Sequence, residues 1–420
     1  MCRGCGLGYT VGAMNKKFPE GFYWGAASAS YQVEGGIENV DWAKAAGEGR
    51  VPACGRACDH YHLYEKDFDI VKSLGHNAHR LSIEWARIEP EEGKFDEKEI
   101  EHYRDVLRAL HARGITPFIT LWHFTLPLWF SEKGGFEQKD SPEIFARYCA
   151  YVVEHLKDLC NNFSTINEPI VFASNGWLRG TWPPFKRFAL TDMVAITNSG
   201  RQHEARYQKD IRHMFLYFRV VKNLAKAHNV AYDAIKKMSP AVDVSVVTHI
   251  VLFQSNSNPF NMLAATFMNW FWTYRFMNRI HKKCDSIGLN YYIHKKFGDT
   301  KNYEKTDMDW DIYPEGMCEC LRMLARYKKP LFVSEAGIAD AKDTRRASYI
   351  ERQVDAVYCA LEEGIDVRGH MYWSLLDNYE WALGFEKRFG LIAIDYETLE
   401  RTVRPSAYVY KKICEDNGIL

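Results

Sequence analysis

The sequence predicts an α/β fold: a single-domain (β/α)8 TIM barrel with elaborated loops over the face formed by the carboxyl ends of its strands. Short apolar runs with strand character alternate with amphipathic helical stretches, a pattern typical of parallel sheets. There are eight such units, the number that closes a barrel. In addition, most of the apolar runs end in a polar or aromatic residue, which packing inside a barrel does not require.

The eight predicted strands lie at 22–27, 78–83, 117–122, 163–167, 242–248, 286–290, 330–334 and 370–374. Apolar residues with helical spacing predict helices at 97–113, 143–159, 224–237, 316–327 and 345–363. About 75 residues separate the fourth strand from the fifth, more than one β/α unit needs. We interpret this spacer as extra loop and helix over the barrel mouth, not as a second domain.

The domain organisation is predicted to be simple. Residues 14–420 form the barrel domain, because no flexible linker, low-complexity segment or internal repeat interrupts them. Residues 1–13 precede the first recognisable strand and lack the long apolar core of a secretory signal. We expect them to be a leader or a start-site extension, disordered or dispensable.

The charge balance excludes several classes of partner. Lysine plus arginine and aspartate plus glutamate each number 54, so the formal net charge is zero, and there is no basic block. We therefore expect no nucleic-acid partner and no membrane partner. The nearest candidate for a membrane span, residues 261–280, is interrupted by asparagines and arginines. A cytoplasmic protein that binds small molecules is expected, and a homo-oligomer is possible.

The cysteines favour a reducing compartment. Their number, 11, is odd, and they are scattered along the chain, which fits free thiols better than a disulfide framework. Cys2, Cys5, Cys54 and Cys58 could form a zinc site, but the two pairs are far apart and differently spaced. We expect no metal.

Two glutamates point to chemistry. Glu168 stands in the segment TINEP at 165–169, and Glu335 stands in FVSEAG at 332–337. Each follows a short apolar run, where a strand should stop and a loop begin. A barrel brings distant strand ends to one face, and a pair of carboxylates across a cleft is the minimal machinery for cleaving a glycosidic bond.

Further segments extend this pattern along the chain. They are ASASYQVEG at 27–35, TLWH at 120–123, IGLNYY at 287–292, YWSLLDN at 372–378, EW at 380–381 and RFGL at 388–391. With the two glutamate segments and in this order, they resemble glycoside hydrolase family 1, the retaining β-glycosidases. The resemblance runs from about Phe18 to Tyr410, which is nearly the whole chain.

The resemblance implies roles for particular residues. Glu168 matches the general acid/base and Glu335 the nucleophile, with their carboxyls expected roughly 5–5.5 Å apart. Four residues match the groups that support the reaction: Arg80 and Tyr292 beside Glu335, Asn167 at the sugar 2-hydroxyl, and Asn290 behind the site. For Arg80, a salt bridge within the barrel is the alternative interpretation.

The resemblance also implies a sugar subsite. The residues that match it are Gln32, His123, Glu380, Trp381, Trp373 and Phe389, with Trp373 as the stacking platform or, alternatively, a core tryptophan. Relatives that act on 6-phosphosugars carry serine at the position of Glu380 and tyrosine at that of Phe389. We therefore expect unphosphorylated glycosides and short oligosaccharides as substrates, with no cofactor.

The implied function is a retaining β-glycosidase that removes terminal non-reducing β-glycosyl residues, with β-glucosidase and side β-galactosidase and β-fucosidase activities. A transglycosylase using the same intermediate is the alternative within enzymes. A catalytically silent sugar-binding protein is disfavoured because both glutamates are present. The chain departs from the family at Ala336, where asparagine is usual, and at Phe124, where tryptophan is usual.

Overall fold

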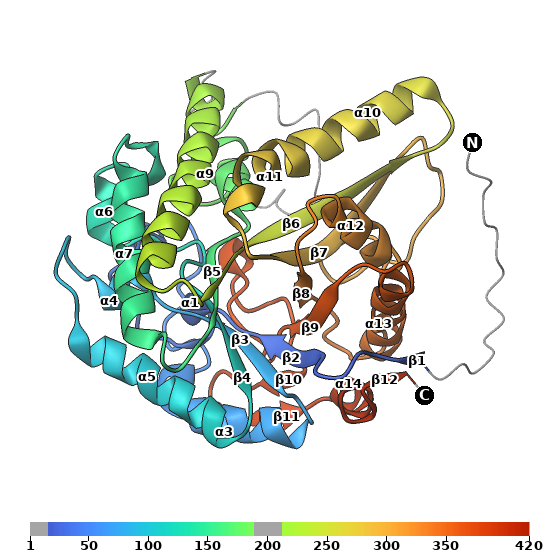
Figure 1. Cartoon of the computed structure of the whole chain (residues 1–420), viewed down its shortest axis with the longest axis horizontal. Helices are drawn as coiled ribbons and strands as arrows, with labels where there is room; N and C mark the ends of the chain where they lie inside the picture. Colours follow the sequence, from blue (N-terminus) through green and yellow to red (C-terminus); the bar gives the residue numbers. More distant parts are fainter. Residues whose placement is uncertain (1–15, 189–211, 420) are drawn as a thin grey trace.

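The computed structural model describes residues 16–188 and 212–419, so the predicted leader at 1–13 and residues 189–211 lie outside the described part. Eight parallel strands form a closed barrel in chain order (Figure 1). Their bounds are β2 Tyr23–Ala27, β3 Ala78–Ser82, β4 Thr116–Thr120, β5 Asn162–Asn167, β6 Asp243–Ser255, β7 Ser286–Phe297, β8 Leu331–Ala336 and β9 Val367–Trp373. The barrel closes where β2 pairs with β9, with Ala27 opposite Trp373. The predicted barrel and all eight strands are confirmed.

Helices surround the barrel, and every predicted helix is present. The longer ones are α3 His60–Ser73, α5 Glu97–Ala112, α7 Ser141–Leu156, α8 Pro169–Trp177, α9 Arg212–Met238, α10 Pro259–Asn269, α12 Gly316–Ala325, α13 Arg346–Glu362 and α14 Pro405–Asp416. The shorter ones are α1 Ser30–Val33, α2 Asp41–Gly47, α4 Trp85–Ile88, α6 Leu128–Glu132, α11 Arg275–Ile280 and the single turns η1 Gly135–Glu137, η3 Trp270–Tyr274, η4 His281–Lys283 and η5 Trp381–Leu383.

Two small antiparallel pairs were not predicted. β1 (Lys16–Lys17) pairs with β12 (Gly418–Ile419) and so joins the two ends of the described chain. β10 (Ile392–Ile394) pairs with β11 (Arg401–Val403). Both involve strands of two or three residues, which are too short to show an alternating pattern in the sequence.

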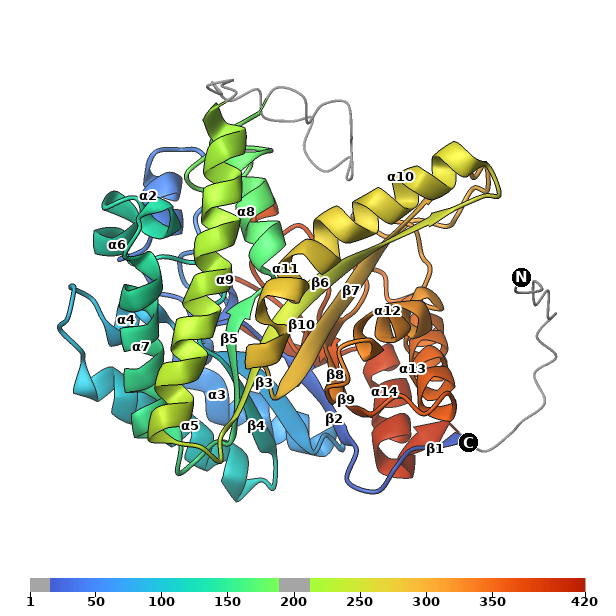
Figure 2. The same cartoon turned by 45° about the horizontal axis from the view of Figure 1, so that its top comes forward.

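Strands β6 and β7 are longer than the sequence predicted. They remain paired beyond the barrel as far as Ser255 opposite Phe297, and α10 lies along this extension in both views (Figures 1 and 2). The predicted strand ended at residue 248, but the run at 249–253 continues it, because the neighbouring strand and α10 bury this run. The region after β6 is therefore a strand and helix arm.

Two apolar clusters form most of the core of the described chain. The larger lies between the barrel and the surrounding helices. The smaller lies inside the barrel, where Phe118, Phe332 and Met371 pack with small residues such as Ala27 and Ala78. Phe118 and Phe332 have ring centroids 5.6 Å apart. The interior thus uses a few large side chains instead of layers of valine, isoleucine and leucine.

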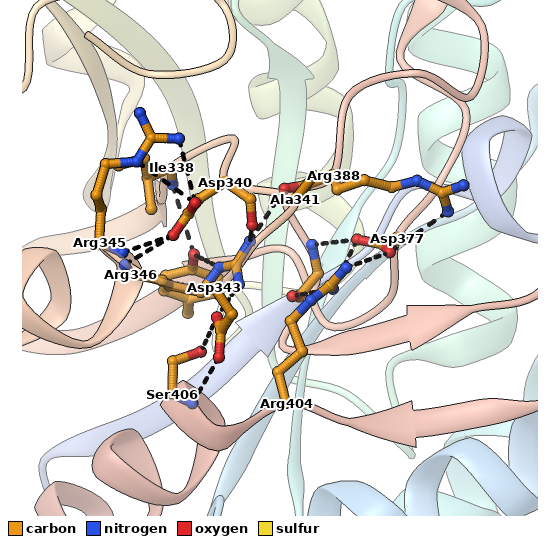
Figure 3. A network of polar contacts seen from close by, with 12 residues as sticks. Ile338, Asp340, Ala341, Asp343, Arg345, Arg346, Asp377, Arg388, Arg404 and Ser406 are labelled. Atoms are coloured by element: carbon orange, nitrogen blue, oxygen red, sulfur yellow. Dashed lines mark hydrogen bonds and ion pairs between the residues drawn. The ribbon is translucent and has the colours of Figure 1, made fainter.

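A buried polar network supports the loops after β8 and β9 (Figure 3). The fully buried Arg346 side chain donates to the carbonyls of Asp340 and Arg388, at 2.7 and 3.0 Å, and pairs with Asp343. Beside it, Arg404 pairs with Asp377 at 2.8 Å. Because Asp340 follows the Glu335 strand and Arg388 precedes Phe389, the network ties together two loops of the candidate site.

Within residues 16–188 and 212–419, no helix has both the length and the apolar composition needed to cross a bilayer.

Candidate active site

Glu335 lies near the carboxyl end of β8, where the side chains of two residues contact its carboxylate. The guanidinium of Arg80, on β3, pairs with one carboxylate oxygen and donates to the carbonyl of Ser334 at 3.3 Å. The hydroxyl of Tyr292, on β7, donates to the other carboxylate oxygen at 2.9 Å. Both residues were predicted at Glu335, and the structure places them there.

Gly337 explains why the motif needs a glycine two residues after Glu335. A Cβ at this position would lie 1.7 Å from the carbonyl oxygen of Trp373. The chain leaving β8 therefore passes directly against the end of β9, and only glycine fits this approach. This contact sets Glu335 beside the predicted sugar platform. Ala336 is fully buried at the strand end.

Glu168 occupies a sharp turn between β5 and α8. The following Pro169 begins the helix, which suits its fixed φ, and it disfavours a helical conformation at Glu168. Glu168 has φ 44°, in the left-handed region that side chains rarely adopt. Its backbone N–H donates to Val247 at 2.9 Å, which attaches the turn to β6.

Amide side chains connect the two glutamates. Asn290 donates to Glu168 at 2.6 Å and to the Asn167 carbonyl oxygen at 3.3 Å. Arg80 donates to that same oxygen at 2.8 Å while it contacts Glu335. Ser334 fixes the Asn290 side chain by donating to its carbonyl oxygen at 2.7 Å. One continuous network therefore joins residues from β3, β5, β7 and β8.

The two carboxyls have unequal surroundings. Burial raises the pKa of Glu168 well above its ordinary value, and the nearby charge of Glu335 raises it further. Burial also raises the pKa of Glu335, but Arg80 and Tyr292 offset part of this effect. When the pair holds one proton, the proton belongs on Glu168, because Glu335 has a cation and a phenol to stabilise its charge.

On the opposite side of the site, Gln32 has a fixed orientation. Its amide nitrogen donates to Asn378 at 3.0 Å and to the carbonyl of Tyr379 at 2.7 Å. Its carbonyl oxygen is buried and has no hydrogen-bond partner. A buried acceptor of this kind is costly unless a ligand fills its place, which fits the predicted contact with a sugar hydroxyl.

His123 is neutral and similarly poised. Burial and the charge of Arg80 lower its pKa well below the ordinary value. The Asn167 amide nitrogen lies 3.2 Å from Nε2, so Nε2 accepts and the proton is assigned to Nδ1. Nδ1 is buried without a partner and is therefore a directional donor available to a ligand.

Two indole rings lie nearly parallel to the ring of His123. The His123 ring is 5.9 Å from the Trp373 ring and 6.1 Å from the Trp381 ring, with interplanar angles of 16° and 13°. Phe389 belongs to the barrel-interior cluster with Trp373. All six predicted sugar-subsite residues lie on the β2, β4 and β9 side of the barrel mouth. Trp373 is also part of the core, which was the alternative interpretation of this residue.

Glu380 is the remaining member of this subsite. Burial raises its pKa to about 8, and the charge of Glu335 contributes. The next residue, Trp381, has φ 52°, so the backbone turns sharply between the two. Below pH 8, the Glu380 carboxyl is mostly protonated and can donate as well as accept hydrogen bonds.

Sequence reasoning missed two rings near Glu335. His249, on β6, and Trp310 lie 5.9 and 5.8 Å from the ring of Tyr292. Each has a buried ring nitrogen without a partner, Nδ1 in His249 and Nε1 in Trp310. His249 directly follows the predicted fifth strand, and that position was the available signal. Trp310 lies in an irregular loop, where no sequence signal marks it.

Among the described residues, one group has the spacing to hold a metal: Cys318 on α12, Cys359 on α13 and Glu363 directly after α13. Glu363 already pairs with Arg322, and the two thiols contact one another at 3.0 Å. Cys54 and Cys58, from the zinc alternative, are buried and donate separately to backbone carbonyls; Cys2 and Cys5 lie outside the described residues.

A barrel with two glutamates at the ends of β5 and β8 defines a class of glycoside-cleaving enzymes. Comparison with known proteins identifies the family. The model described as "Glycosyl hydrolase family 1" matches residues 14–282 and 261–419. A β-glucosidase A from Thermotoga maritima is 30% identical over 471 residues, covering 96% of this chain and 99% of that protein.

Two further relatives are similar over nearly the whole chain. A β-galactosidase from Sulfolobus acidocaldarius is 29% identical, covering 96% of each protein. The structure of a β-glycosidase from Pyrococcus horikoshii superposes with a TM-score of 0.86 and 35% identity, covering 97% of both chains. The chain belongs to glycosyl hydrolase family 1 and is a glycoside hydrolase. The resemblance inferred from its motifs is confirmed.

Proposed function

We propose that this chain is a retaining β-glycosidase in which Glu335 is the nucleophile and Glu168 the general acid/base. The observation that carries the assignment is the asymmetry between the two carboxyls. Arg80 and Tyr292 both stabilise charge on Glu335, whereas Glu168 receives a neutral amide donor. A nucleophile must be ionised and a general acid protonated before the first step.

The reaction then proceeds by two displacements. The Glu335 carboxylate attacks the anomeric carbon while Glu168 transfers its proton to the departing oxygen. A covalent glycosyl-enzyme forms, and the aglycone leaves as an alcohol. Glu168, now ionised, removes a proton from water, which attacks the anomeric carbon and releases Glu335. Retained configuration follows from two inversions.

The proposed substrates are small unphosphorylated β-glycosides. Three groups support recognition of a free sugar: the unpartnered oxygen of Gln32, Nδ1 of His123 and the carboxyl of Glu380. Relatives named β-glucosidase and β-galactosidase support glucosides with side acceptance of galactosides. Because the pKa of Glu380 is about 8, its charge repels a sugar phosphate fully only above that pH. At lower pH, shape and hydrogen bonding must exclude it.

Trapping of the intermediate tests this proposal. The enzyme is incubated with 2-deoxy-2-fluoro-β-glucosyl fluoride, whose fluorine slows both steps while its leaving group keeps the first one feasible. Intact mass and peptide mapping should find one fluoroglucosyl unit on the peptide containing Glu335. An adduct on another residue would reject the assignment. The absence of any adduct, with the galactosyl analogue also inert, would favour a sugar-binding protein.

The role of Glu168 is tested by leaving-group dependence. Glu168→Ala should form the glycosyl-enzyme at near wild-type rate from dinitrophenyl glucoside, because this leaving group needs no proton. With an alkyl glucoside, the rate of this step should be about 10²–10⁴-fold lower in the variant than in the wild type. Equal losses on both substrates would show that Glu168 is not the acid.

A further inference from the structure

The arm after β6 carries an unusually apolar outer surface. On α10 and the adjoining turn, five large side chains are exposed: Phe260, Met262, Leu263, Phe267 and Trp270. Phe260 is 83% exposed and Leu263 69%. Enzymes in solution rarely present such a contiguous group, and where they do it usually marks an interaction surface. We call these five residues the α10 patch.

The patch continues onto the first turns of α9. Phe267 and Phe271 have ring centroids 6.1 Å apart, and Phe271 stacks on Tyr217 at 6.0 Å. On the same part of α9, Phe215 and Phe218 are also exposed. The outer ends of α9 and α10 both project from the same side of the molecule as the β6–β7 extension (Figure 2).

Charge around the patch is mostly positive, although Lys296 pairs with Asp299 and Lys226 pairs with Glu143. Residues 244–274 contain no aspartate, glutamate, lysine or arginine. The flanks are basic: α9 has Arg212, Arg219, Lys222 and Lys226 before its first acidic residue, and Arg275 and Arg279 follow the patch. On β7, Lys295 and Lys296 lie opposite the end of β6. An apolar centre with cationic borders complements an anionic lipid surface.

The dimensions favour a bilayer surface over a bilayer span. α10 has 11 residues, about 16 Å at 1.5 Å per residue, whereas a span needs about 20 residues. A short helix with phenylalanine and leucine on one face and tryptophan at its end is typical of segments that lie at the lipid headgroup level.

We propose that the α10 patch docks this enzyme on anionic lipid bilayers as a peripheral protein. Balanced overall charge predicted no membrane partner, but that average conceals the local arrangement. α10 follows the carboxyl end of β6, and Glu168 and Glu335 lie at the carboxyl ends of β5 and β8. Docking through α10 would therefore bring the catalytic face of the barrel toward the lipid surface.

Vesicle co-sedimentation tests the proposal independently of catalysis. The full chain is mixed with vesicles of phosphatidylcholine and phosphatidylglycerol, and with vesicles of phosphatidylcholine alone. We compare the wild type with the triple variant Phe260→Ser, Leu263→Ser and Phe267→Ser, whose sites are exposed. Tyr408→Ser, at an exposed aromatic on α14 (57% exposed), is the matched control. Thermal unfolding checks that each variant folds.

The wild type and Tyr408→Ser should sediment with the anionic vesicles, and the triple variant should bind them at least about tenfold more weakly. The wild type should bind neutral vesicles more weakly than anionic vesicles. Its binding to anionic vesicles should decrease when salt is added. Absence of wild-type binding, or equal binding by the triple variant, would overturn the proposal. The proposal would also be overturned if the wild type did not bind vesicles but formed a dimer that the triple substitution dissociated. The patch would then join two copies of the chain.

Discussion

At the residue scale, the site depends on which carboxyl holds the charge. Glu335 and Glu168 are both buried, and burial alone would protonate both. The difference comes from two donors on Glu335, the Arg80 guanidinium and the Tyr292 hydroxyl. Removing a donor should therefore raise the pKa of Glu335 and narrow the pH range in which one carboxyl is ionised and the other is not.

Tyr292→Phe tests this idea. Loss of the hydroxyl should lower kcat/KM by about tenfold to a hundredfold, since hydrogen bonds to charged groups contribute about 1.5–3 kcal/mol. The acid limb of the kcat/KM profile should also move to higher pH, because the ionised form of Glu335 loses a donor. Tyr303→Phe is the control, since Tyr303 donates to Asp299 away from the site. An unmoved acid limb would contradict the assigned role of Tyr292.

Glu380 should make stability depend on pH. Its pKa rises from an ordinary 4.5 to about 8 in the folded chain, so the folded state retains a proton that the unfolded chain releases at lower pH. The free energy of unfolding should therefore fall as pH rises from 4.5 to about 8. Urea unfolding of Glu380→Gln across this range should show a shallower fall than the wild type.

The control for this measurement is Glu386→Gln, at an exposed glutamate in the same loop. Its pH dependence should parallel that of the wild type. Other buried carboxyls with raised pKa values, such as Asp41, give the same sign, and the comparison between variants removes their contribution. Parallel curves for Glu380→Gln and the wild type would mean that folding leaves the pKa of Glu380 unchanged.

At the scale of elements, the fold was predictable because strand and helix periods alternate eight times. The pairing of Arg80 and Tyr292 with Glu335 was also predictable, but from the motifs and not from periodicity. The length of β6 was not predictable, because the apolar run at 249–253 has no turn residue to mark where the barrel ends. The places of His249 and Trp310 beside Tyr292 depend on β6–β7 pairing and on an irregular loop, so no local pattern revealed them.

The loops after β8 and β9 depend on Arg346, at the start of α13. Its side chain is fully buried and contacts two backbone carbonyls, the Tyr372 hydroxyl and Asp343. Arg346→Met should leave these groups unpaired and lower the free energy of unfolding by about 3–5 kcal/mol. Arg352, also on α13, forms an exposed pair with Glu315, and Arg352→Met should cost about 1 kcal/mol or less. Equal losses in the two variants, measured by urea unfolding, would contradict a structural role for the network.

At the scale of the whole molecule, the two faces of the barrel have different tasks. The proposed catalytic groups lie at the carboxyl ends of the strands. At the opposite end, the first and last described strands meet: β1 pairs with β12, and the Phe18 N–H donates to the Asn417 carbonyl at 2.9 Å. Asn417 also accepts from the Trp24 indole at 2.8 Å. In barrel enzymes, this face contributes stability and not chemistry.

Phe18→Ala should separate the two tasks. The ring of Phe18 is buried against Phe22 and Trp24, each with a centroid distance of 4.8 Å. Its removal should lower the free energy of unfolding by about 3–5 kcal/mol, the usual range for a buried phenylalanine. Below the unfolding temperature, kcat/KM should stay within about twofold of the wild type, because Phe18 precedes β2 and the site lies beyond its far end. Tyr408→Ala, at an exposed ring, should change neither quantity. A parallel loss of kcat/KM in fully folded Phe18→Ala would show that the amino-terminal face also positions the catalytic groups, through the short β2 strand that leads to Gln32.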